Sequence, residues 1–98
     1  MSEPYPYDFS GSVGITFHLP SRRRFIPHSW LLHADMNEKG TELQLHYTHW
    51  LVTIHGTNLS GLHDQVAKFQ VSWVRELTLH REYDPSVSRI EIAEKVSD

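Results

Sequence analysis

Residues 29–55 read SWLLHADMNEKGTELQLHYTHWLVTIH and contain three segments in which apolar and polar side chains alternate. Alternation with a period of two is typical of a β-strand that buries one face. The pattern predicts strands at 30–36, 42–48 and 50–55, joined by turns at 37–40 and 48–49. This stretch therefore predicts a three-stranded antiparallel meander with one apolar face, and the rest of the chain must fit around it.

The alternation also predicts how the three strands pair. If Tyr47 lies opposite Trp50 and Met36 lies opposite Thr41, three cross-strand rows are wholly apolar. These rows are Ala34/Leu43/Ile54, Leu32/Leu45/Val52 and Trp30/Tyr47/Trp50. In the alternative, a type I turn with a left-handed Gly40 shifts the pairing by one residue. We favour the first register, because a one-residue shift would expose an apolar face.

The opposite face of the meander carries candidate metal ligands. In the favoured register the row Asp35/Glu42/His55 spans all three strands, and His33 lies diagonally beside it. Two carboxylates and an imidazole could bind a divalent metal ion or share a proton. The alternative is a solvated face on which His55 pairs with Glu42. A second candidate set, His46 and His49 with His55, does not converge in this register.

The segments on either side of the meander predict the remaining elements. Alternation predicts strands at 13–19, 22–26 and 71–79, and apolar residues at helical spacing predict an amphipathic helix that ends near residue 69. The element order is then β-β-β-β-β-α-β. We therefore predict an α+β, mostly β fold, in which five or six antiparallel strands form a curled sheet or a small open barrel.

A chain of 98 residues is long enough for one domain with a single core. We predict a single domain over 1–98 with an irregular N-terminal arm at 1–12. The C-terminal segment, 80–98, is ambiguous. Residues 89–92 alternate as in a strand, whereas Val87, Ile90 and Ala93 have the spacing of a helix; we favour a short strand.

Composition excludes several kinds of chemistry. The chain has no cysteine, which excludes disulfides and thiolate-bound zinc, and it has no apolar run of membrane-spanning length. We expect a cytoplasmic protein. The formal charge of −3 argues against a general nucleic-acid coat, although eight histidines could reverse its sign on acidification.

One basic cluster nevertheless suggests nucleic-acid binding. Arg22, Arg23 and Arg24 precede Phe25 on a predicted strand. Small β-folds bind single-stranded nucleic acid with arginine and aromatic side chains. The alternative is an edge strand whose charges prevent aggregation.

The aromatic row Trp30/Tyr47/Trp50 is a candidate interface, because one narrow helix cannot cover it together with the N-terminal strands. We therefore expect a homo-oligomer, or binding to another protein. No catalytic motif is present, and no cofactor is predicted. The favoured function is a small, non-catalytic, self-associating interaction module. A nucleic-acid-binding protein and a His/carboxylate metal protein are the alternatives.

Overall fold

A computed structural model describes residues 5–78 and 84–95 of the protein. Its elements are β1 (Tyr7–Asp8), β2 (Gly14–His18), β3 (Arg23–Pro27), the 3-10 turn η1 (His28–Trp30), β4 (Leu31–Met36), β5 (Glu42–Tyr47), β6 (Trp50–Thr57), α1 (Ser60–Ala67), β7 (Trp73–Arg75) and β8 (Ser86–Glu94). The strands and the helix predicted from the sequence are present, although β7 is shorter than predicted. The α+β, mostly β class is confirmed.

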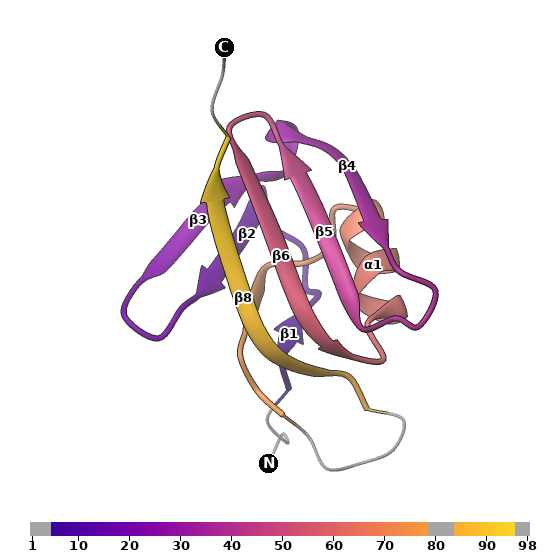
Figure 1. Ribbon diagram of the computed structural model, residues 1–98. Coiled ribbons are helices and arrows are strands. Elements are labelled where there is room, and N and C mark those ends of the chain that lie inside the picture. Colours follow the sequence, from indigo (N-terminus) through magenta and orange to yellow (C-terminus); the bar gives the residue numbers. More distant parts are fainter. Residues whose placement is uncertain (1–4, 79–83, 96–98) are drawn as a thin grey trace.

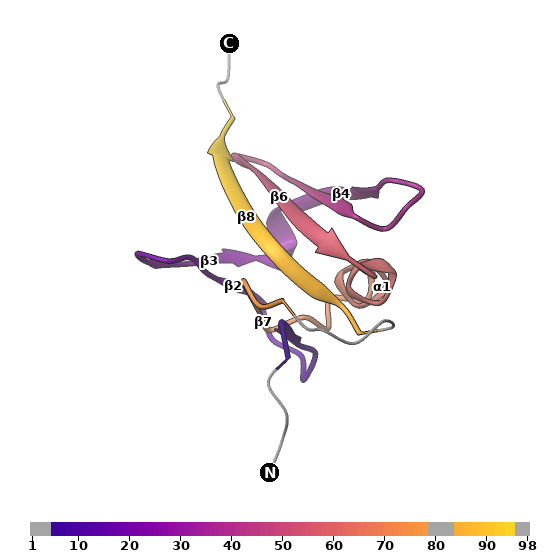
Figure 2. The same cartoon turned by 60° about the horizontal axis from the view of Figure 1, so that its bottom comes forward.

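The strands form two four-stranded sheets, ordered β1-β7-β2-β3 and β4-β5-β6-β8. Neither sheet closes into a barrel. The chain passes from the first sheet to the second at Pro27, where η1 redirects it. Figure 1 shows α1 behind β4 and β5, and Figure 2 shows β2, β3 and β7 on the same side of the second sheet. The first sheet and α1 together therefore cover one face of the second sheet.

Both ends of the chain contribute to these sheets. In the predicted N-terminal arm, β1 pairs with β7, and Tyr7 is only 6% exposed. In the C-terminal segment, β8 pairs with β6 over its length, so the strand interpretation is confirmed and the helix alternative is wrong. Residues 1–4, 80–83 and 96–98 of these two predicted segments lie outside the described residues.

The buried apolar side chains of both sheets and α1 form one core. Phe17 of the first sheet packs edge to face on Tyr47 of the second, with ring centroids 6.5 Å apart. The largest fully buried side chains are Tyr47, Phe17, Ile15, Ile26, Leu43, Leu45, Ile54, Leu59, Leu62, Val52, Val66 and Val71. Alternation along the strands predicts most of this inner face.

The predicted pairing of β5 with β6 is confirmed, with Leu43 opposite Ile54 and Leu45 opposite Val52. The predicted pairing of β4 with β5 is wrong by two residues, because Ala34 lies opposite Leu45 rather than Leu43. A shift of two residues keeps the same side chains on the same face. Periodicity alone could not distinguish these two registers.

The position of the first turn explains this shift. The side-chain oxygen of Asn37 accepts hydrogen bonds from the backbone N–H groups of Thr41 and Glu42, 2.9 and 3.1 Å away. Gly40 occupies the left-handed region with φ +67°. Asn37 therefore pairs with Glu42, and the four-residue loop is 38–41 rather than the predicted 37–40. Moving the loop by one residue along the chain shifts the pairing of β4 with β5 by two residues.

Because β4 is irregular near its start, two further predicted cross-strand rows are not observed. Leu31 lies opposite Tyr47 and His33 lies opposite His46, so Leu32 bulges out of the pairing. Leu32 is 64% exposed, and Trp30, in η1, is 43% exposed. The apolar rows predicted through Leu32 and Trp30 are therefore wrong, and Leu31 packs on the core instead.

Candidate metal centre

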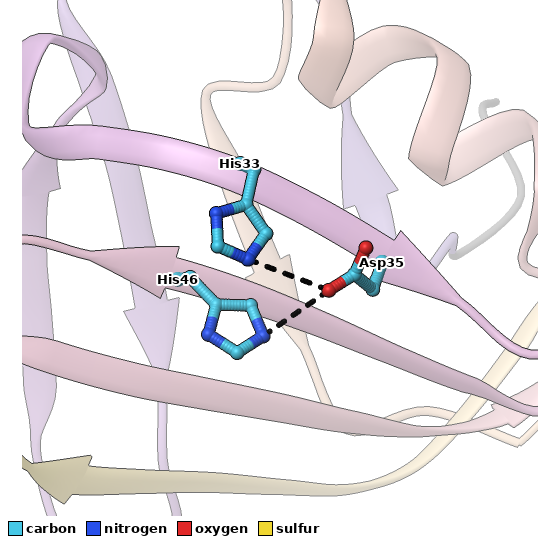
Figure 3. A group of neighbouring side chains, drawn as sticks. All are labelled: His33, Asp35 and His46. Atoms are coloured by element: carbon cyan, nitrogen blue, oxygen red, sulfur yellow. Dashed lines mark ion pairs between the residues drawn. The ribbon is translucent and has the colours of Figure 1, made fainter.

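The outer face of the second sheet gathers three potential metal ligands, His33, Asp35 and His46. His33 and Asp35 are two residues apart on β4, so they share a face, and His46 lies opposite His33 on β5. The two imidazole rings stack with centroids 4.2 Å apart and planes 17° apart. Figure 3 shows both rings presenting a nitrogen to the same Asp35 carboxylate oxygen.

The distances in this cluster suit a metal site better than a hydrogen bond. The Nε2 atoms of His33 and His46 each lie 3.4 Å from Asp35 Oδ2. A good N–H···O bond is about 2.9 Å long. Ligand atoms about 2.0–2.1 Å from a tetrahedral zinc ion lie about 3.3 Å from one another. One donor atom from each of the three residues lies within 4.8 Å of the other two, so the three residues form a group that could hold one metal ion.

The protonation of His46 favours ligation at neutral pH. Its side chain is 22% exposed, whereas those of His33 and Asp35 are 57% and 66% exposed. Burial lowers the pKa of His46, and the charges of His33 and Lys95 lower it further. The negative charge of Asp35 raises this pKa, but its effect is smaller. A lowered pKa keeps the imidazole neutral, and the neutral imidazole is the form that binds metals.

The metal ligands predicted from the sequence separate into two groups. His33 and Asp35 join His46, which the predicted register had placed in a different row. Glu42 and His55 pair as predicted, but Asp35 lies opposite Gln44 and not in their row. This correction follows from the two-residue shift of β4.

His55 contacts carboxylates from both neighbouring strands. Its Nε2 lies 2.7 Å from Glu91 Oε1, and its Nδ1 lies 3.7 Å from Glu42 Oε1. Arg89 contacts the other oxygen of Glu91 at 3.6 Å. This second group is therefore an ion-pair network on the sheet surface, as the solvated-face alternative describes.

The predicted basic cluster splits between the two faces of the first sheet. Arg22 is exposed beside the β2–β3 turn, and Arg23 and Phe25 are exposed on β3. Arg24 turns inward, with its guanidinium 4.3 Å from the ring centroid of Trp50. This cation–π contact links β3 of the first sheet to β6 of the second.

The predicted aromatic interface is divided in the same way. Tyr47 is fully buried within the chain, and Trp50 is half-buried beneath Arg24. Trp30 remains on the surface, where the centroid of its ring lies 5.8 Å from that of the His49 ring. The three rings therefore do not form one exposed row.

Comparisons with protein-family models, with curated proteins and with solved structures found no match to this chain. Within residues 5–78 and 84–95, no helix has the length and apolar character that crossing a bilayer requires. Functional inference for this protein therefore rests on its own geometry.

Proposed function

We propose that this protein binds a divalent transition metal ion through His33, Asp35 and His46. The observation that carries the proposal is the convergence of three donor atoms from β4 and β5 within 4.8 Å. Two imidazoles and a carboxylate form a donor set that suits Zn²⁺, Cu²⁺, Ni²⁺ and Co²⁺. Three protein ligands leave a fourth tetrahedral position for water or for another donor.

The predicted self-association has less support than the metal centre. It rests on an aromatic row that one copy cannot cover, and of that row Tyr47 is fully buried within the chain whereas Trp30 is 43% exposed. A homo-oligomer, a non-catalytic role and a cytoplasmic location remain predictions.

The proposal is tested by calorimetric titration of the untagged protein with Zn²⁺ and Co²⁺. We expect one ion per chain, and we expect NMR signals of the His33 and His46 rings to shift before those of other histidines. Replacing His46 with Ala removes one ligand and should weaken binding at least about tenfold. Binding should also weaken as pH falls, because protons compete for the imidazoles.

His55→Ala is the matched control, because His55 lies on the same face but is held by Glu42 and Glu91. This variant should bind the ion as tightly as the parent. Absence of a bound ion in the parent protein would contradict the proposal. So would an equal loss of affinity in the His46→Ala and His55→Ala variants, since the proposed centre uses only the first.

A further inference from the structure

The outer face of the first sheet brings together basic side chains that are far apart in the sequence. On this face His18 of β2 lies between Arg23 of β3 and Arg75 of β7. Adjacent strands are about 4.8 Å apart, so these side chains form one row across three strands. Burial lowers the pKa of His18, and the charges of Arg23 and Arg75 lower it further, which indicates a positive local potential.

A second row, two residues along the strands, carries aromatic rings. Thr16 of β2 lies between Phe25 of β3 and Trp73 of β7. Phe25 is 50% exposed, and its ring lies across Gly14, where an added Cβ would come within 2.6 Å of Phe25 Cζ. The guanidinium of Arg75 lies 5.1 Å from the Trp73 ring centroid. The two rows are about 6.8 Å apart, so rings and cations run side by side.

Negative charge is concentrated on the other sheet. On the first sheet, Asp8 of β1 lies beside Trp73 at the edge-strand end of the aromatic row. Its carboxylate accepts hydrogen bonds from the hydroxyls of Ser10 and Ser72. The outer face of the second sheet carries three carboxylates, Asp35, Glu42 and Glu91, and one arginine, Arg89. The formal charge of −3 is therefore unevenly distributed, and an anion that approaches the first sheet meets arginines first.

We propose that the outer face of the first sheet binds single-stranded nucleic acid. The row Arg23–His18–Arg75 contacts phosphates, and Phe25 and Trp73 stack on bases. Cationic side chains beside exposed rings hold single strands in this way with little sequence preference. Duplex nucleic acid fits this face less well, because its bases are stacked on one another and are not free to stack on Phe25 and Trp73. An acidic protein also fits less well, because it would bind the arginines without needing the aromatic rings. This proposal is independent of the metal site.

Fluorescence anisotropy with labelled oligouridylate and oligodeoxythymidylate of about 12 nucleotides tests the proposal. Phe25→Ala removes a stacking ring and should weaken binding about 5- to 100-fold without changing its salt dependence. Arg23→Ala removes one phosphate contact and should reduce the slope of log affinity against log salt by about 0.7. Both side chains are exposed, so circular dichroism should show parent-like folding.

Arg89→Ala is the matched control, because Arg89 is an exposed arginine on β8, on the other sheet. This variant should bind like the parent and keep the same salt slope. The proposal is overturned if the parent protein does not bind single strands at low ionic strength, or if Phe25→Ala binds as well as the parent. Duplex DNA binding equally tightly, or polyglutamate competing as well as the oligonucleotide, would also overturn it.

Discussion

At the scale of single residues, the core contains a polar group that its surroundings do not satisfy. Tyr47 is fully buried, and its ring packs on Phe17. Among the residues that the structure describes, its hydroxyl has no hydrogen-bond partner. Burial raises the pKa of this hydroxyl, because a phenolate is strongly disfavoured away from water. A buried hydroxyl without a partner reduces stability, whereas the ring around it contributes to the core.

Replacing Tyr47 with Phe should therefore leave the free energy of unfolding unchanged, or raise it by up to about 1 kcal/mol. Tyr7→Phe is the control, because the Tyr7 hydroxyl hydrogen-bonds the side chain of Tyr5; this variant should lose about 1 kcal/mol. Urea denaturation measures both changes. A loss of more than about 1 kcal/mol in Tyr47→Phe would mean that the hydroxyl has a partner, such as a bound water molecule.

At the scale of elements, the bulge in β4 decides which side chains enter the core. Leu31 faces inward and Leu32 faces solvent, because the pairing with β5 shifts between Leu31 and His33. The register of His33 to Met36, which is set by the turn, places His33 and Asp35 on the outer face beside His46. The irregular position therefore decides which leucine of β4 enters the core, whereas the register shift sets the geometry of the candidate metal centre.

The bulge and the register expected from the sequence predict different stabilities for a variant at Leu32. That register placed Leu32 and Leu45 side by side in the core, whereas only Leu45 is buried in the structure. Leu32→Ala should change the free energy of unfolding by less than about 0.5 kcal/mol. Leu45→Ala should reduce it by about 2–5 kcal/mol. Thermal or urea denaturation of the two variants measures the difference, and equal losses would support the register without the bulge.

At the scale of the whole molecule, the two sheets present outer faces of different chemistry on opposite sides of one core (Figure 2). One face carries histidines and carboxylates, and the other carries arginines, the exposed ring of Phe25 and the half-buried ring of Trp73. Several histidines lie where burial lowers their pKa values, namely His18, His28 and His46. This distribution makes the stability of the fold depend on pH.

The sign of that dependence follows from the lowered pKa values. A histidine in the unfolded chain has a pKa of about 6.5, so below this value the unfolded state binds more protons than the folded state. Stability should therefore be greatest at neutral pH and should fall as pH decreases from about 7 towards 5. Urea denaturation midpoints across this range measure the change.

His28 should contribute strongly to this loss, because it is only 6% exposed. Replacing it with Gln should flatten the decline in stability below about pH 6.5. His49→Gln, a change at an exposed turn position, is the control and should keep the parent profile. A midpoint that does not change between neutral and mildly acidic pH in the parent protein would contradict the expected linkage.

The amino-acid sequence by itself determined strands β2 to β6, the helix and the two faces of the central meander, but not the short strand β1. These features depend on local alternation and on helical spacing, which are visible along the chain. The pairing of β5 with β6 was also predictable, because a two-residue turn leaves little freedom. Of the candidate site, the sequence identified His33 and Asp35 on one strand face, and it identified Arg23 and Phe25 within the cluster at 22–25.

Only the tertiary structure decided how β4 pairs with β5 and that the strands divide between two sheets. Alternation is unchanged by a two-residue shift, so it could not place Asp35 beside His46 rather than in the row of Glu42 and His55. The sequence also could not show that Arg75 and Trp73 join Arg23 and Phe25. Those contacts depend on long-range pairing of β7 with β2, which the packing of the whole core selects.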